Sequence, residues 1–202
     1  MEYKHSGNLI FKYGPMNSAK TVNLLTKAYE LNARNNNVIL LKPAIDTRTA
    51  SKCIKSRIEG VKSRPCVRVN KEDNLITIIE KEINQVTNGH RIWVLVDEAQ
   101  FLDPKQIDQL ATIVDTYGLT VLCYGIRTDF RTTVFPGAMR LFEIADSIEE
   151  ISSTCDCGRN NIVNARMDKD GRVVTEGSQV ELGAEEKYIT LCRKCYYKRI
   201  NK

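Results

Sequence analysis

Gly14-Pro15-Met16-Asn17-Ser18-Ala19-Lys20-Thr21 is the stretch that decides the fold of this chain. An apolar run, residues 8–13, precedes it, and an amphipathic stretch, residues 21–35, follows it with apolar residues at helical spacing. The stretch matches the phosphate-binding loop pattern at every position except Ala19, where the pattern has a second glycine. Lys20 would reach the β- and γ-phosphates of a nucleotide, the Thr21 hydroxyl would ligate Mg²⁺, and the helix N-terminus would face the anion. The alternative interpretation is an ordinary strand-to-helix turn.

Short apolar runs alternate with amphipathic stretches over the first two-thirds of the chain. The spacing predicts strands at residues 8–13, 38–41, 91–96, 119–124 and 147–151, and helices at residues 21–35, 75–85, 104–117 and 139–145. Strands that are apolar on both faces and alternate with helices indicate a parallel sheet covered by helices. The predicted fold class is therefore α/β, a P-loop (RecA-like) parallel sheet flanked by helices.

Acidic and polar residues follow the predicted strands. The run Trp93-Val-Leu-Val-Asp97-Glu98 places Asp97 where the partner of a phosphate loop holds Mg²⁺, and the next acid, Glu98, can act as a general base. Many strands end in an acid at a solvated edge, but the pairing with the phosphate loop favours the functional interpretation. Asp46-Thr-Arg48 and Arg127-Thr-Asp-Phe130 follow two other strands. Ligands bind outside the carboxyl ends of parallel strands, so these segments are expected to converge on one crevice.

The cysteines indicate a metal site near the C-terminus. Four of the seven form two close pairs, Cys155-Asp-Cys157 and Cys192-Arg-Lys-Cys195. Four thiolates suit tetrahedral Zn²⁺ in a closed structural site, and four buried free thiols are the alternative. After Ile151 the composition changes, and cysteine pairs, glycines and short alternating runs replace the long apolar and amphipathic stretches. This change predicts a nucleotide-binding domain over residues 1–151 and a small zinc-binding domain over residues 152–202. A small domain buries little core surface, and a structural metal would supply the missing stability.

Composition excludes several classes of protein. The apolar fraction is 42% and the charged fraction 27%, close to average globular usage and unlike a disordered chain. No apolar run approaches the roughly 18 residues of a membrane span, and residues 1–6 lack the apolar core of a signal peptide, which predicts a cytoplasmic protein without membrane contact. The net charge, 30 − 25 = +5, permits anionic ligands without requiring nucleic acid. The basic segment 52–71 could attract a triphosphate or touch nucleic acid, although a solvated loop is the commoner explanation.

These motifs, taken in order, resemble the zinc-containing (type II) thymidine kinases, in the form found in bacteria. The resemblance covers nearly the whole chain and rests on Gly14–Thr21, Asp46-Thr-Arg48, Asp97-Glu-Ala-Gln-Phe101, Tyr124-Gly-Ile-Arg-Thr-Asp-Phe130, Cys155-Asp-Cys-Gly158, Gly177–Gly183 and Glu186–Tyr196. The chain departs from the family pattern at Ala19, and a single residue separates Cys155 from Cys157, as in some bacterial members.

The resemblance implies transfer of a phosphoryl group from ATP to thymidine, which gives ADP and thymidine monophosphate for nucleotide salvage. Glu98 would take the proton from the 5′-hydroxyl. It implies that ATP and Mg²⁺ are bound by Gly14, Pro15, Met16, Asn17, Ser18, Ala19, Lys20, Thr21, Asp46, Arg48, Asp97 and Gln100. It implies that thymidine is bound by Met16, Phe101, Ile126, Phe130, Tyr188 and a lasso loop of Gln179, Val180, Glu181, Leu182 and Gly183. It also implies structural Zn²⁺ on the cysteines, a homotetramer, and inhibition by thymidine triphosphate.

Two rival functions stay open at the level of sequence. The first is a phosphate-loop ATPase that acts on DNA and binds the DNA strand with its zinc module. It would hydrolyse ATP faster in the presence of DNA and would not respond to thymidine. A nucleotide-binding protein whose loop is disabled by Ala19 predicts ligand binding without turnover.

Overall fold

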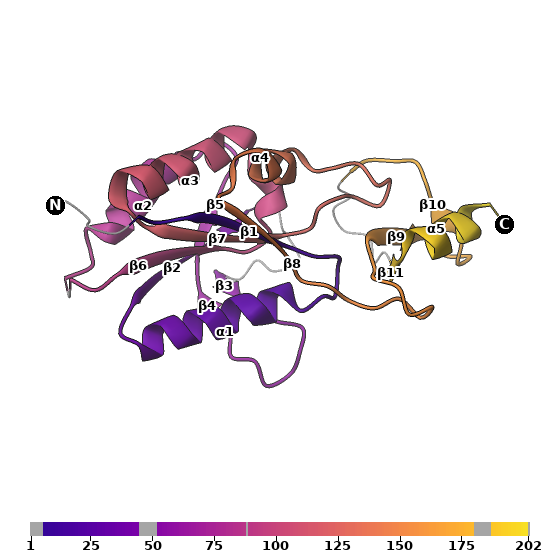
Figure 1. Cartoon of the computed structure of the whole chain (residues 1–202), viewed down its shortest axis with the longest axis horizontal. Helices are drawn as coiled ribbons and strands as arrows, with labels where there is room; N and C mark the ends of the chain where they lie inside the picture. The colour runs from indigo at the N-terminus through magenta and orange to yellow at the C-terminus, as the bar shows by residue number, and fades with distance from the viewer. Residues whose placement is uncertain (1–5, 45–51, 88, 180–186, 202) are drawn as a thin grey trace.

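A six-stranded parallel sheet, here called the main sheet, forms the centre of the molecule. The computed structural model of the protein describes residues 6–44, 52–87, 89–179 and 187–201. The strand order is β5-β2-β6-β7-β1-β8, and every pairing is parallel (Figure 1). The strands are β1 (Leu9–Tyr13), β2 (Asn37–Pro43), β5 (Val67–Val69), β6 (Ile92–Val96), β7 (Thr120–Gly125) and β8 (Ser147–Glu150). The predicted α/β class with a parallel sheet is confirmed.

Helices cover both faces of the main sheet. Helix α1 (Lys20–Ala33) lies on one face, and α2 (Leu75–Ile83), α3 (Pro104–Tyr117) and α4 (Pro136–Ile144) lie on the other (Figure 1). Alternate residues of each strand face opposite layers. In β6, Leu95 packs with the leucines of α1, whereas Val94 and Val96 pack with the apolar residues of α3. Both faces are therefore buried, which is why these strands are continuous apolar runs in the sequence.

Local capping explains why α3 begins and ends where the sequence predicts. The Asp103 side chain accepts a hydrogen bond from the Lys105 amide, and the Gln106 side chain accepts one from the Asp103 amide, which forms a capping box. Pro104 occupies the first helical position, where its missing N–H costs nothing. Gly118 ends the helix in the left-handed conformation, at φ 63°.

The basic segment 52–71 is more ordered than a solvated loop. It contains a short antiparallel hairpin, β3 (Cys53–Ile54) with β4 (Arg64–Pro65), and then the edge strand β5. Ile54 is fully buried in the layer between the main sheet and α1. Strands of two or three residues carry no readable periodicity, so the sequence pattern missed them.

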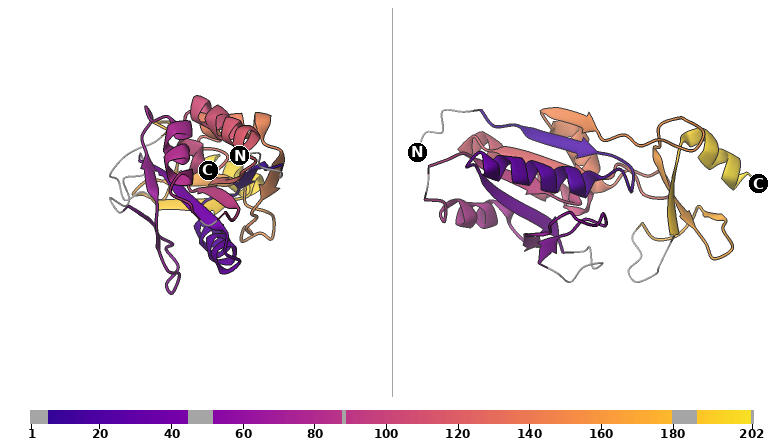
Figure 2. Two further views of the ribbon diagram at one scale, coloured as in Figure 1. Left: turned by 90° about the vertical axis from the view of Figure 1, so that its left-hand side faces the viewer. Right: turned by 90° about the horizontal axis from the view of Figure 1, so that it is seen from below.

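A second, smaller sheet follows residue 151, and we call the described residues from 152 onward the tail. The tail sheet is antiparallel, in the order β10-β9-β11, with β9 (Val163–Met167), β10 (Val173–Val174), β11 (Lys187–Leu191) and then α5 (Arg193–Ile200). It lies beyond the end of the main sheet at which the strands finish (Figure 2). The division into domains at residue 151 stays a prediction. Among the described helices, none has the length and apolar character that a membrane crossing requires.

Candidate active site

The loop between β1 and α1 is held close to its neighbours. A methyl group at Gly14 would lie 2.3 Å from the Ile151 carbonyl oxygen and 2.6 Å from the Ser18 hydroxyl oxygen, so only glycine fits. The Gly14 amide donates to the Gly125 carbonyl at 3.2 Å, which joins the loop to β7. Asn17 and Ala19 both take the left-handed conformation, at φ 59° and 60°. This turn brings the chain into α1 with its amides at the carboxyl end of the main sheet.

The conformation of Ala19 explains why the phosphate-loop pattern has glycine at this position. A left-handed backbone costs roughly 1–2 kcal/mol for an ordinary residue and almost nothing for glycine. Glycine also loses more conformational freedom on folding than alanine, by roughly 0.5–1 kcal/mol. The strain of the left-handed backbone is larger than the entropy that alanine saves, so alanine at position 19 destabilises the loop conformation relative to glycine.

Ala19→Gly is therefore expected to tighten ATP binding by about 1 kcal/mol at most, about fivefold in Kd. Calorimetric titration of both forms with ATP measures the change. Ala111→Gly, in the middle of α3, is the matched control, and it should lower stability while leaving ATP affinity unchanged. Weaker ATP binding by the Ala19 variant would show that the loop is adapted to alanine.

Lys20, Thr21 and Asp97 converge from two elements, as predicted. The Lys20 ammonium donates to the Pro15 carbonyl at 2.6 Å, which places it over the loop. The Thr21 hydroxyl donates to Oδ1 of Asp97 at 3.3 Å. Asp97 follows β6, is 3% exposed, and its amide donates to the Leu41 carbonyl of β2. A hydroxyl and a carboxylate oxygen beside a phosphate loop are the ligand types that Mg²⁺ prefers.

Glu98 has an unusual backbone conformation, and its side chain has a defined partner. Its φ is 55°, in the left-handed region, where a long side chain is strained by roughly 1–3 kcal/mol. The Gln100 amide nitrogen donates to Oε2 of Glu98 at 2.6 Å, and the Gln100 amide oxygen accepts from the Ile126 amide at 3.1 Å. Gln100 is 2% exposed. This buried bridge, which orients the Glu98 carboxylate, was not predicted from the sequence.

The residues expected around the nucleoside base fall into two groups. Met16, Phe101 and Ile126 belong to one apolar cluster, in which the Phe101 ring meets Phe135 edge to face at 5.5 Å. Phe130 is 1% exposed, and its ring lies 4.9 Å from the guanidinium of Arg166 and 5.7 Å from that of Arg131. The Tyr196 hydroxyl donates to the Phe130 carbonyl at 3.2 Å.

Several predicted site residues lie outside the described part of the chain. They are Asp46 and Arg48, which follow β2 in the sequence, and Val180, Glu181, Leu182 and Gly183 of the lasso. Gln179, the first residue of the lasso, is the last described residue of its segment. Tyr188 lies on β11, directly opposite Arg166 of β9.

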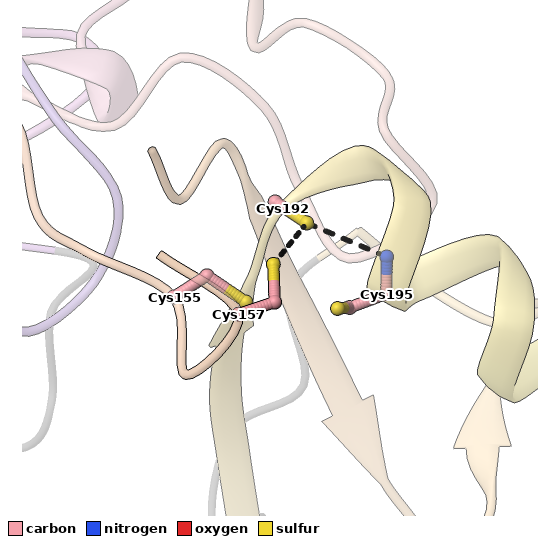
Figure 3. A group of neighbouring side chains, drawn as sticks. All are labelled: Cys155, Cys157, Cys192 and Cys195. Atoms are coloured by element: carbon pink, nitrogen blue, oxygen red, sulfur yellow. Dashed lines mark hydrogen bonds between the residues drawn. The ribbon is translucent and has the colours of Figure 1, made fainter. Parts of the chain in front are cut away.

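The four tail cysteines lie together in a cluster that could hold a metal ion (Figure 3). Cys155 and Cys157 come from the loop before β9, and Cys192 and Cys195 come from the start of α5. The four Sγ atoms lie within 4.8 Å of one another, and those of Cys157 and Cys192 are 3.4 Å apart. Tetrahedral zinc with Zn–S bonds of about 2.3 Å needs sulfur atoms roughly 3.8 Å apart, so this arrangement fits a closed structural site.

The thiols in this group have unequal acidities. Hydrogen bonds from the backbone amides of Cys157 and Cys192 lower the pKa of the Cys155 thiol to about 7. The Cys195 amide, 3.4 Å from Sγ of Cys192, lowers the pKa of that thiol. Hydrogen bonding with the Cys157 and Cys192 side chains raises the pKa of the Cys195 thiol to about 12. Four negative sulfurs this close repel one another, so all four ionise together only around a cation.

Two further arginines contact the site. Arg57, in the hairpin loop after β3, donates to the Asn17 side chain of the phosphate loop at 3.4 Å. Arg131 pairs with the buried carboxylate of Asp129 at 2.8 Å and donates to the Gly177 carbonyl at 3.1 Å, next to the lasso. Neither arginine was predicted as a site residue. The only signal for Arg57 in the sequence was its place in the basic segment 52–71, and Arg131 directly follows the motif that ends at Phe130.

Comparison with known proteins identifies the family. The family model described as thymidine kinase matches residues 7–196. Curated thymidine kinases from Rhizobium meliloti and Enterobacteria phage T4 are 41% and 42% identical over 92% and 93% of this chain, and over 94% of each relative. The thymidine kinase from Zymomonas mobilis is 38% identical over 96% of this chain and 97% of its own length. A solved ATPase domain has the same fold, with a TM-score of 0.51 at 14% identity over 84% of this chain and 80% of that chain. This chain belongs to the thymidine kinase family.

Proposed function

We propose that this protein transfers the γ-phosphoryl group of ATP to the 5′-hydroxyl of thymidine, giving ADP and thymidine monophosphate. The convergence of Thr21 and Asp97 beside Lys20, in a chain of the thymidine kinase family, is the observation that carries this proposal. Phosphoryl transfer requires positioning and charge stabilisation more than covalent catalysis. The phosphate loop supplies the stabilisation, and the residues of the tail and of the Phe101 cluster supply the positioning.

The phosphate loop binds the triphosphate. Amides from Asn17 onward and the N-terminus of α1 face the β- and γ-phosphates. The Lys20 ammonium, which contacts the Pro15 carbonyl in this structure, shifts to the γ-phosphoryl oxygens as negative charge spreads over them. Thr21 and Asp97, which lie in contact, would hold Mg²⁺. When bound, Mg²⁺ neutralises charge on the β- and γ-phosphates.

Glu98 is the general base. As the bond between the 5′-oxygen and the γ-phosphorus forms, the bond from that phosphorus to the β,γ-bridging oxygen breaks, and the hydroxyl proton passes to the Glu98 carboxylate. Gln100 holds that carboxylate in place by its 2.6 Å hydrogen bond. The backbone strain at Glu98 is consistent with a residue held for function rather than stability.

Thymidine binds between the apolar cluster and the tail. Met16, Phe101 and Ile126 surround the base, Phe130 and Tyr188 close the pocket, and the lasso from Gln179 to Gly183 reads the base edge with its backbone. Zn²⁺ on the four cysteines anchors both ends of the lasso segment. Thymidine triphosphate inhibits by occupying this site, and the active enzyme is a homotetramer.

One assay tests the function and separates it from its rivals. The protein is incubated with ATP, Mg²⁺ and each nucleoside in turn, and the nucleoside monophosphate is measured. Thymidine should be phosphorylated and deoxycytidine barely at all, because a site that hydrogen-bonds one base edge leaves its own polar groups unpaired with the other. ATP hydrolysis stimulated by DNA and indifferent to thymidine would favour a DNA-dependent ATPase. Nucleotide binding without any product would indicate an inactive binding protein.

A further inference from the structure

Asn164, in the middle strand of the tail sheet, contacts both loops that form the active site. Its side-chain oxygen accepts a hydrogen bond from the Met16 amide of the phosphate loop at 2.7 Å. Its side-chain nitrogen donates to the Thr128 carbonyl, in the loop after β7, at 3.2 Å. The residue is 2% exposed. A single buried amide thus joins the tail, the phosphate loop and the loop that carries Phe130.

The contact determines which amides of the phosphate loop face the nucleotide. Pro15 has no N–H, and the Met16 N–H already donates to Asn164, so neither residue offers a free amide to a phosphate. The left-handed turns at Asn17 and Ala19 start directly after this anchor point. Any anion cradle therefore starts after Met16, and its starting point is set by a residue of the tail.

Asn164 is itself held in place by the strands and the cysteine-containing core of the tail. Strand β9 pairs with both β10 and β11. The neighbours of Asn164 along the strand, Val163 and Ala165, are buried in one cluster with Cys155 and Cys192. Two residues further on, Arg166 stacks on Phe130. The position of the Asn164 amide thus depends on the same strand that supports the nucleoside side of the site.

We propose that Asn164 is a positioning residue that sets the phosphate loop from the tail and couples the nucleoside site to the ATP site. This inference rests on the proposed function, because it takes the tail to be the thymidine-binding side. Breaking the bridge leaves the part-buried Met16 N–H and the buried Thr128 C=O without this partner, and the loop loses its anchor. Coupling between two ligands is reciprocal, so thymidine strengthens ATP binding by the same factor as ATP strengthens thymidine binding.

Asn164→Leu tests the proposal, with Asn161→Leu as its matched control. Asn161 is also a buried tail asparagine, 3% exposed, but its amide donates only within the tail segment, to Ser153 at 3.1 Å and Thr190 at 3.2 Å. Both variants lose a buried amide and should lower the melting temperature. The affinity of the full chain for the β,γ-imido analogue of ATP, with Mg²⁺, is measured by calorimetry with and without thymidine.

In Asn164→Leu, the Kd of the ATP analogue should rise about tenfold, equivalent to about 1.4 kcal/mol, and thymidine should no longer change it. In Asn161→Leu, both the Kd and the effect of thymidine should match the unaltered chain. Hydrogen exchange at the Met16 amide, followed by NMR, should accelerate in the Asn164 variant alone, because the amide loses its acceptor. Asn164→Ala provides the same readouts if the leucine variant does not fold.

Equal loss of nucleotide affinity in both variants, or no loss in either, would overturn the positioning role. Weaker binding of the analogue with an unchanged effect of thymidine would overturn the coupling. Failure of the unaltered chain to phosphorylate thymidine would overturn the proposed function instead. The exchange rate at Met16 and the affinity for the analogue still report on Asn164 in that case, so the two failures are distinguishable.

Discussion

Replacing Glu98 with glutamine is expected to lower the rate of thymidine phosphorylation by about 10²- to 10⁴-fold. Glutamine has the shape of glutamate but cannot take up the proton of the 5′-hydroxyl. Its side-chain oxygen can still accept the hydrogen bond that Gln100 donates to Glu98, so the local packing should survive. Binding of ATP and thymidine should change little, because the phosphate loop and the base pocket are untouched. Steady-state kinetics and calorimetry on the same preparation measure both quantities.

Glu30→Gln is the control for this substitution. Glu30 is exposed on α1, pairs only loosely with Lys27 at 3.5 Å, and lies near the end of the helix that is remote from the phosphate loop. The variant makes the same change of charge and should keep normal turnover. Near-normal turnover in Glu98→Gln would show that another group accepts the proton.

Cys192→Ala is expected to remove the metal and unfold the tail. Among the described residues, the buried cluster of the tail consists of Cys155, Val163, Ala165, Leu191, Cys192 and Tyr196, and two of these are proposed sulfur ligands. Binding of structural zinc contributes roughly 10–16 kcal/mol in small domains, far more than so small a core can supply. Metal analysis should find about one zinc in the unaltered chain and none in the variant. Loss of the tail removes the Asn164 bridge and the lasso, so thymidine turnover should fall by at least about 10²-fold.

Cys123→Ala separates this effect from the loss of any buried cysteine. Cys123 is fully buried in β7 of the main sheet and belongs to the core beneath α3. Its replacement should lower the melting temperature but leave the zinc content and the tail intact. A folded, active Cys192 variant that holds no metal would reject the structural zinc site.

The main sheet could be predicted because its strands are buried on both faces. Such strands are mostly apolar runs, and the apolar residues of the helices between them recur every three or four residues, so β1, β2, β6 and β7 were expected near their observed positions. The edge strand β8 was also expected near its observed position, although its residues are mostly exposed. The three short strands between Cys53 and Val69, and those of the tail, were not expected as strands. A run of two or three residues, as in β3, β4, β5 and β10, carries too little pattern to show a strand, and whether a short segment forms a strand depends on its packing in the folded chain.

By itself, the sequence determined the parts of this protein that local chemistry requires. A phosphate loop requires its lysine and hydroxyl at fixed spacing, a metal partner requires an acid at a strand end, and a zinc site requires paired thiols. Lys20, Thr21, Asp97 and the cysteine pairs were therefore predicted as site residues, and the structure brings Thr21 to Asp97 and the four sulfurs together.

Only the tertiary structure decided how these parts are held. The sequence pattern did not show the Gln100 bridge to Glu98 or the Asn164 bridge across 148 positions. An asparagine is an ordinary polar residue until two separate sheets pack so that its amide bonds to backbone groups of two loops. The geometry of such a contact depends on the packing of both sheets at once, and no short stretch of sequence contains that information.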